Sequence, residues 1–213
     1  VESVPVTLTV TRQAEITQHP ASLTLCEGAT ATFTVNAGLT TNPSYLWERS
    51  LDGGLTWGPL AGATGASYTI AAAGTADNNT AYRAIVSSTC GSSVTSLPAF
   101  LTVNELPEIT DQPDNVTICE YAIADFIVDA GVTTGAIYRW QRSTDGGMTW
   151  NYLNESATYF GVSTMNLKVN GTLRTMSGDR FRVIISGTCL PPVTSNAAVL
   201  TVDTAPEILA QPL

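Results

Sequence analysis

The stretch Ala31-Thr32-Phe33-Thr34-Val35 alternates apolar and polar side chains with a period of two. It returns as Ala124-Asp125-Phe126-Ile127-Val128, where Ile127 makes the alternation less regular. Successive side chains of a β-strand point to opposite faces, so this pattern predicts strands with one buried face. The segments 82–86 and 101–103 alternate in the same way, and Gly, Pro, Asn and Ser recur at spacings of roughly 8 to 12 residues. The sequence therefore predicts an all-β protein of the sandwich class.

An internal repeat divides the 213 residues into two complete copies. The segment 15–20 recurs as 108–113, an offset of 93 that also relates Trp47 to Trp140. Beyond Trp150 the offset becomes 99, so the second copy holds six additional residues within 151–180. Self-similarity at a fixed period is typical of repeat arrays.

The repeat predicts the domain boundaries. We expect one domain over residues 12–104 and a second over 105–204. Residues 1–11 contain a segment similar to the closing strand of a repeat, and residues 205–213 contain one similar to its opening strand. The expectation is a piece of a longer tandem array in which neighbouring repeats of the same chain are partners.

The order of features resembles an immunoglobulin-like domain of the I-set kind. Trp47 resembles the core tryptophan of strand C, and Tyr82 resembles the tyrosine of the corner before strand F. The second copy has Phe181 at the corner position, which lacks a hydroxyl. The resemblance implies two tandem immunoglobulin-like β-sandwich domains. The positions of the buried cysteines that such domains carry in strands B and F are occupied here by Val35, Ala84, Val128 and Val183.

The composition excludes two classes of partner. The chain has nine Lys and Arg residues against 18 Asp and Glu, a net charge of −9, and a single His. A nucleic-acid binder needs a basic surface, and so does a protein held at an anionic membrane. No apolar run approaches the roughly 18 residues of a membrane-spanning helix, so membrane insertion is not expected.

The four cysteines predict an exported, extracellular protein with disulfides. Closure within each domain would join Cys26 to Cys90 and Cys119 to Cys189. The I-set resemblance instead places Cys26 and Cys90 at opposite ends of one sandwich, too far apart for a bond. In that case Cys26 would pair with Cys189 between the domains, leaving Cys90 and Cys119 for neighbouring repeats. Both pairings stay open at this point.

A second motif, S-x-D-G-G-x-T-W, occurs once in each copy, at residues 50–57 and 143–150. It resembles the Asp-box, a β-hairpin motif of sialidase propellers and other folds. We expect the Asp to accept backbone hydrogen bonds, the Gly pair to allow positive φ and the Trp to pack under the turn. Calcium at the Asp or sugar stacking on the Trp is the alternative. The motif residues are Asp52, Gly53, Gly54 and Trp57, and Asp145, Gly146, Gly147 and Trp150.

Candidates for binding and catalysis are few. Tyr152, Tyr159 and Phe160, beside or within the segment that differs between the copies, are possible contacts for a glycan or protein ligand. A metal site or cofactor is not expected, although oxygen ligands could hold Ca²⁺ at an acidic cluster near the domain junction. Its members are Glu105, Glu108, Asp111 and Asp114. His19 is the one possible imidazole base, and the pair Asp125 and Asp129 is better explained as a solvated strand face, so no catalytic site is predicted.

The repeats also resemble those of very large secreted or surface proteins of bacteria, a group that includes adhesins and multi-domain extracellular enzymes. The resemblance implies a non-catalytic stalk or adhesion module in a protein that is secreted or attached to the cell surface. The short, Pro107-containing linker agrees with a stiff connection. The alternative function is a carbohydrate-binding accessory module of a secreted polysaccharide-degrading enzyme.

Overall fold

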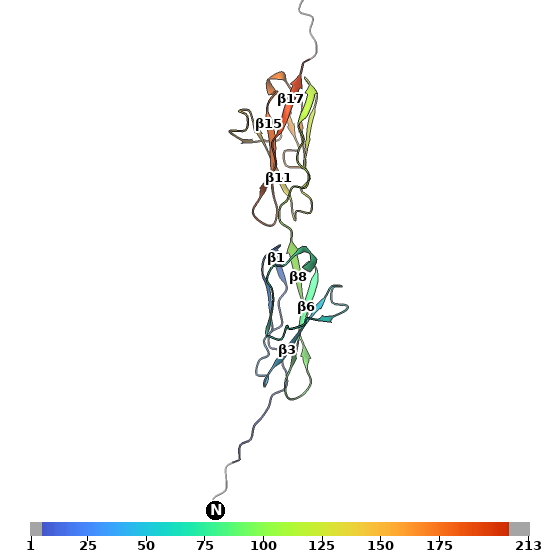
Figure 1. Cartoon of the computed structure of the whole chain (residues 1–213), viewed down its shortest axis with the longest axis vertical. Helices are drawn as coiled ribbons and strands as arrows, with labels where there is room; N and C mark the ends of the chain where they lie inside the picture. The colour runs from blue at the N-terminus through green and yellow to red at the C-terminus, as the bar shows by residue number, and fades with distance from the viewer. Residues whose placement is uncertain (1–5, 205–213) are drawn as a thin grey trace, which may run out of the picture. The chain divides into compact units, whose positions relative to one another are not determined.

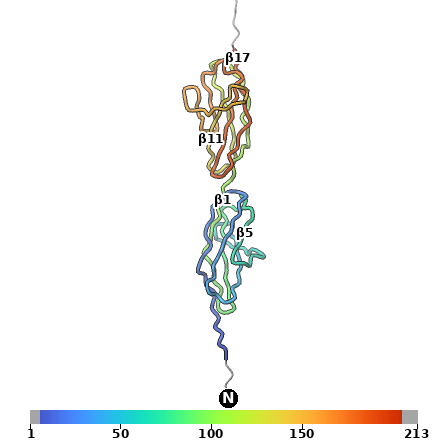
Figure 2. Tube along the Cα trace, turned by 90° about the vertical axis from the view of Figure 1, so that its left-hand side faces the viewer, coloured from blue at the N-terminus to red at the C-terminus, as the bar shows by residue number. Residues whose placement is uncertain are grey.

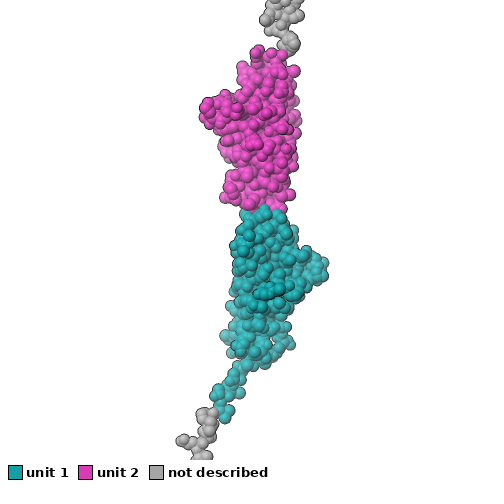
Figure 3. All heavy atoms as spheres, in the orientation of Figure 1, with its two compact units in different colours: residues 1–104 teal, residues 105–213 magenta. Residues whose placement is uncertain are grey.

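The computed structural model describes residues 6–204 (Figure 1). It contains two compact units, residues 1–104 (unit 1) and 105–213 (unit 2), coloured separately in Figure 3. Each unit is built from one continuous stretch of chain (Figure 2). None of the described residues belongs to a helix with the length and apolar character needed to cross a membrane.

Unit 1 consists of two β-sheets. One sheet has the strand order β1-β8-β6-β3-β4, with β7 paired to β6, and the other pairs β2 with β5. The strands are β1 (Leu23–Cys26), β2 (Ala31–Thr34), β3 (Ser44–Ser50), β4 (Gly58–Pro59), β5 (Ser67–Ile70), β6 (Thr80–Ser87), β7 (Val94–Thr95) and β8 (Ala99–Asn104), and a 3-10 helix η1 (Thr75–Asp77) precedes β6.

Unit 2 repeats this plan. Its sheets have the orders β12-β11-β15-β17-β9, with β16 paired to β15, and β10-β14-β13. The strands are β9 (Val116–Cys119), β10 (Ala124–Ile127), β11 (Ile137–Ser143), β12 (Asn151–Tyr152), β13 (Tyr159–Phe160), β14 (Asn166–Val169), β15 (Arg180–Ser186), β16 (Val193–Thr194) and β17 (Ala198–Asp203), with a 3-10 helix η2 (Arg174–Met176) before β15.

The core of each unit lies between its two sheets, around a fully buried tryptophan. Trp47 on β3 and Trp140 on β11 have no exposed surface, and their cross-strand partners are Ala84 and Val183. In unit 1 Tyr82 stacks on Phe33, with 4.6 Å between ring centroids. The aliphatic residues that the sequence places at the immunoglobulin cysteine positions are all buried, so apolar packing alone fills this part of the core.

The corner position differs between the units. In unit 1 the Thr80 hydroxyl hydrogen-bonds to the hydroxyl of buried Tyr82 at 3.1 Å. In unit 2 Phe181 stacks on Phe126 instead, with 4.7 Å between centroids. The second unit therefore keeps the aromatic packing of the corner without its phenolic hydrogen bond.

The first and last strands of each unit pair in parallel. Strand β1 lies beside β8 (Figure 1). In their register Leu23 is opposite Leu101 and Cys26 is opposite Asn104, and β9 pairs with β17 in the same way. Before β1, the β-pairing of the described residues is limited to an isolated bridge between Gln18 and Asn36.

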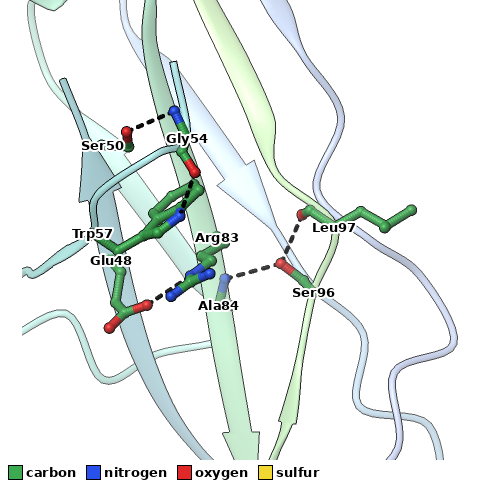
Figure 4. Close-up of polar contacts among 8 residues, drawn as sticks. All are labelled: Glu48, Ser50, Gly54, Trp57, Arg83, Ala84, Ser96 and Leu97. Carbon is green, nitrogen blue, oxygen red and sulfur yellow. Dashed lines mark hydrogen bonds and ion pairs between the residues drawn. The ribbon is translucent and has the colours of Figure 1, made fainter. Parts of the chain in front are cut away.

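A bulge separates the last two strands of each unit. In unit 1 the Ser96 hydroxyl accepts from the Ala84 N–H at 3.0 Å and donates to the Leu97 carbonyl at 2.8 Å (Figure 4). In unit 2 Ser195 makes the corresponding contacts with Val183 and Asn196. In the gap between β7 and β8 a buried serine hydroxyl thus binds the backbone of β6, and in the gap between β16 and β17 another binds that of β15.

The six additional residues of unit 2 lie between β12 and β14. There they form β13, which pairs with β14 through Tyr159 opposite Val169 and Phe160 opposite Lys168. Unit 1 has no assigned strand between β4 and β5 among its described residues. The insertion therefore adds an edge strand to the smaller sheet.

The two terminal segments that resemble parts of further repeats are described only in part. Residues 6–11 have no assigned strand, and Val6, Leu8 and Val10 are largely exposed. Residues 1–5 and 205–213 lie outside the described residues. The expectation that these segments complete strands of neighbouring repeats remains a prediction.

Candidate functional site

The Asp-box hairpin of unit 1 is held by hydrogen bonds within the motif. The Asp52 carboxylate accepts from the Leu55 N–H at 3.0 Å, from the Thr56 N–H at 2.8 Å and from the Thr56 hydroxyl. The Ser50 hydroxyl donates to Asp52 at 2.6 Å and accepts from the Gly54 N–H at 2.7 Å. These bonds close the loop between β3 and β4.

Glycine and tryptophan complete the turn. Gly53 and Gly54 have φ values of 73° and 98°, which favour glycine because it lacks a Cβ. The Trp57 indole N–H donates to the Gly54 carbonyl at 3.0 Å (Figure 4). The hairpin therefore uses each distinctive residue of the motif in its own structure.

Unit 2 reproduces this hairpin. Asp145 accepts from the Thr149 N–H at 2.9 Å and from the Thr149 hydroxyl, and the Ser143 hydroxyl donates to it at 2.7 Å. Gly146 and Gly147 again have positive φ, and the Trp150 N–H donates to the Gly147 carbonyl at 3.0 Å.

The hydrogen bonds explain the acidity of both carboxyl groups. The Ser50 and Thr56 hydroxyls hold the pKa of Asp52 well below its usual range, and Thr149 and Ser143 do the same for Asp145. Each carboxylate is a fixed anion whose oxygens already have local donors. Among residues 6–204, no group of three His, Cys, Asp or Glu side chains is placed to hold a metal ion.

Both hairpin tryptophans contact an arginine of the neighbouring strand. The Arg83 guanidinium lies 4.2 Å from the Trp57 ring centroid, and Arg182 lies 4.1 Å from that of Trp150. Figure 4 shows the Trp57 ring beside Arg83 on β6. A cation–π contact of this kind covers one face of the ring on which a sugar could otherwise stack.

The predicted aromatic ligand contacts do not form one platform. Tyr152 is 46% exposed and belongs to the larger sheet, whereas Tyr159 and Phe160 belong to the smaller one. Tyr159 packs against the core, and its hydroxyl accepts from Arg142 Nη1 at 2.8 Å. Burial raises the pKa of the Tyr159 hydroxyl. Of the three, only Tyr152 and Phe160 are exposed enough to contact a ligand, and they belong to different sheets.

A shallow cavity of about 250 Å³ lies beside the hairpin of unit 1. Its lining consists of Arg49, Leu51, Thr56, Gly58, Pro59 and Leu60. No reactive pair of side chains lines this cavity.

Among the acidic candidates near the start of unit 2, Glu108 uses its carboxylate in local structure. The Glu108 carboxylate accepts from the Val132 N–H at 3.1 Å, and Asp111 forms a backbone bridge with Asp129. Asp114 is exposed, and Glu105 donates its N–H to Thr134 at 2.9 Å. These carboxylates are not gathered around a common point within the described residues.

The cysteines fall into two classes. Cys26 and Cys189 are disulfide-bonded, whereas Cys90 and Cys119 are free thiols. Closure within each domain does not agree with this, because it would engage all four. Pairing of Cys26 with Cys189 stays a prediction.

The remaining catalytic candidates are also structural. His19 Nδ1 accepts from the Leu97 N–H at 3.1 Å, and the counterpart Gln112 makes the same contact with Asn196 at 2.8 Å. Asp125 pairs with Lys168 at 2.8 Å. A glutamine that can replace the histidine argues for a backbone-binding role rather than a catalytic one.

The structure also shows charged residues that the sequence prediction missed. Arg139, Arg180 and Arg182 lie on the outward face of the larger sheet of unit 2, and Arg139 stacks over Tyr152 at 4.0 Å. The alternation of β15, where Phe181 and Val183 are buried, was the available signal. Assigning all three to one face required the pairing of β11 with β15.

Comparison with known proteins supports the fold more than the function. Residues 15–105 match the model of a family described as a domain of unknown function (DUF8696). Over 115 residues, 54% of this chain, the sequence is 33% identical to Endoglucanase C of Cellulomonas fimi. The chain spans about a tenth of the length of that curated relative.

Solved structures of tandem immunoglobulin domains are similar to most of the chain. The match to the titin I-band fragment I67-I69 covers 92% of this chain and 67% of the fragment, with a TM-score of 0.59 and 18% identity. Immunoglobulin domains 1-5 of Sidekick-1 match 89% of the chain and 38% of that protein, with a TM-score of 0.54 and 15% identity. The predicted fold is thereby confirmed: the chain is a tandem module of two immunoglobulin-like β-sandwich domains.

Proposed function

We propose that this chain is a non-catalytic spacer that carries other domains of a larger secreted or cell-surface protein. The observation that carries this proposal is the parallel pairing of the first strand of each unit with its last. Parallel neighbours run the same way, so the chain enters a unit at one end and leaves it at the other. Units of this kind can be repeated along a chain without a returning connection.

Two further observations support the spacer. Each unit has its own buried core, with fully buried Trp47 in one and Trp140 in the other. The distinctive side chains of both hairpins are engaged in local hydrogen bonds and cation–π contacts. Disulfide bonding of Cys26 and Cys189 supports an extracellular location, because disulfides persist in oxidising compartments.

A distance measurement tests the spacer. Fluorophores on non-natural amino acids at Val10 and Asp203 would report the separation of the two ends in single molecules. A spacer predicts one narrow distribution that is unchanged between low and high salt. A broad distribution that shifts with ionic strength would remove the proposal.

The second candidate function is an accessory module of a polysaccharide-degrading enzyme, and the similarity to Endoglucanase C favours it. Such a module would bind the polymer without cleaving it. Sedimentation of the chain with insoluble cellulose, measured against bovine albumin, tests this function. Recovery of all the protein in the supernatant would argue against it for that polymer.

A further inference from the structure

Three arginines of unit 2 lie on one outward sheet face. On β15, Arg180, Arg182 and Ile184 face outward and alternate with buried residues such as Phe181. Arg139 on the neighbouring β11 lies opposite Ile184 and therefore points to the same face. Gln141 lies between Arg182 and Tyr152 in the cross-strand register. We call this surface the arginine face; its members are Arg139, Gln141, Trp150, Tyr152, Arg180 and Arg182.

The guanidinium groups of this face are held by their neighbours. Arg182 Nε donates to Gln141 Oε1 at 2.8 Å while its guanidinium stacks 4.1 Å from the Trp150 centroid. Arg139 stacks 4.0 Å from the Tyr152 centroid. Stacking fixes the plane of a guanidinium and leaves N–H donors at its edge available for an anion.

These cations have no carboxylate counterpart among residues 6–204. Arg139, Arg180 and Arg182 take no part in the ion pairs, with N···O distances up to 4.0 Å, that join described residues. The chain has 18 acidic residues and only nine Lys and Arg, so one third of its cations gather on a face without an ion-pair partner. Unpaired arginines in an acidic protein indicate a surface whose anion comes from outside.

Unit 1 provides the contrast, because its equivalent face is neutral. Leu46 and Ala81 occupy the places of Arg139 and Arg180. The one retained arginine, Arg83, is paired with Glu48 at 2.7 Å. The unpaired charge is therefore a property of unit 2 alone and not of the repeat.

We infer that the arginine face binds an acidic polysaccharide through the carboxylates of its uronic-acid sugars. Arginine forms paired N–H bonds to a carboxylate, and two arginines two residues apart on one strand lie about 7 Å from each other. A polymer with a carboxylate on each sugar presents repeated anions to such a row. The half-exposed ring of Tyr152 adds an apolar surface beside the charges.

This inference goes beyond the spacer, and its choice of a glycan over other polyanions rests on the second candidate function. The test is affinity electrophoresis and calorimetry of the whole chain with sodium polygalacturonate at low salt, with neutral hydroxyethyl cellulose as the comparison polymer. We expect binding to polygalacturonate that weakens as salt is raised.

Two kinds of variant locate the binding. Arg139→Gln with Arg182→Gln removes two cations, and Gln141→Glu supplies the internal carboxylate that unit 1 has at Glu48. Each should weaken binding about tenfold or more while the melting temperature changes little. Arg174→Gln is the matched control, because Arg174 is exposed in the same unit and lies outside the arginine face.

The alternative outcomes overturn the inference in different ways. Absence of binding at low salt removes the arginine face as a site. Binding by the double variant and by Gln141→Glu that is as tight as binding by the unsubstituted chain removes it as well. Equal competition by poly-glutamate removes the preference for a glycan. Binding to hydroxyethyl cellulose that the variants leave intact would support the second candidate function while contradicting the acidic ligand.

Discussion

Arg83 Nε donates to Glu48 Oε2 at 2.7 Å in unit 1, whereas the equivalent contact in unit 2 joins Arg182 to the amide oxygen of Gln141 at 2.8 Å. The two contacts have the same geometry and differ by one negative charge. Glu48→Gln should therefore lower the free energy of unfolding by less than about 1 kcal/mol, because a charge-assisted bond is replaced by a neutral one.

The same substitution should change the charge of unit 1 without changing its fold. Urea denaturation measures the stability of the variant. Affinity electrophoresis measures how strongly polygalacturonate slows its migration, which reports the binding by its surface. Glu48→Gln is expected to increase retardation modestly, since it leaves one cation unpaired. A large loss of stability with no change in retardation would contradict this account of both faces.

The ion pair between Arg142 and Asp179 is expected to matter more. Asp179 is 5% exposed, and its Oδ2 lies 2.8 Å from Arg142 Nε. Arg142→Gln leaves a buried carboxylate without its partner, which should destabilise the chain by about 3 kcal/mol. Arg49→Gln is the matched control, because Arg49 lies 3.9 Å from Asp77 with both side chains more exposed, and about 0.5 kcal/mol is expected there.

The pH dependence of Arg142→Gln has a definite sign. Burial raises the pKa of Asp179 above its ordinary value, and Arg142 opposes that rise. A carboxyl group with a raised folded-state pKa contributes less stability as pH rises above its unfolded-state value of about 3.9. The deficit of the variant should be larger at pH 7 than at pH 4, and Asp179→Asn should restore part of it. Equal deficits at the two pH values would show that the lost interaction is not ionic.

The two hairpin aspartates should make the chain sensitive to acid. Hydrogen bonds from Ser50 and Thr149 contribute to lowering the pKa values of Asp52 and Asp145 in the folded state. Their contribution to stability is present above the unfolded-state pKa of about 3.9 and is lost as pH falls through the folded-state values. The melting temperatures of Asp52→Asn/Asp145→Asn and of the wild type should converge progressively as pH falls below about 3.9. Parallel melting curves from pH 2 to pH 7 would argue against this.

Peptide mapping without reduction tests the cysteine assignments. We predict a crosslinked peptide that contains Cys26 and Cys189, and alkylation of Cys90 and Cys119 in the native protein. Cys119 should react faster, because it is exposed and Cys90 is half-buried. Recovery of a Cys26–Cys90 peptide would contradict the pairing, and full alkylation of Cys189 would contradict its disulfide.

Periodicity and repetition predicted most of the fold. The alternation around Phe33 and Phe126 predicted strands β2 and β10, and the change of the offset to 99 located the additional residues of unit 2. Their conversion into β13 was not predictable, because a strand of two residues has no periodicity and depends on pairing with β14.

The candidate site was less accessible from sequence. The exposed aromatic Tyr152 was a predicted ligand contact, but Tyr159 was not distinguishable from it until packing against the core and the bond to Arg142 were known. Arg139 and Arg182 are 43 residues apart, and only the register of β11 against β15 brings them to one face. The alternation of β15 indicates that Arg180 and Arg182 share a face, but the addition of Arg139 to that face depends on long-range pairing.

The parallel pairing of β1 with β8 has a mechanical consequence. A pull on the two ends of unit 1 draws these strands past each other along their length, because each is loaded from the opposite end. All the hydrogen bonds of the register from Leu23–Leu101 to Cys26–Asn104 then resist in shear together instead of breaking one after another. The same holds for β9 and β17, so each unit is suited to bear tension along the chain that it extends.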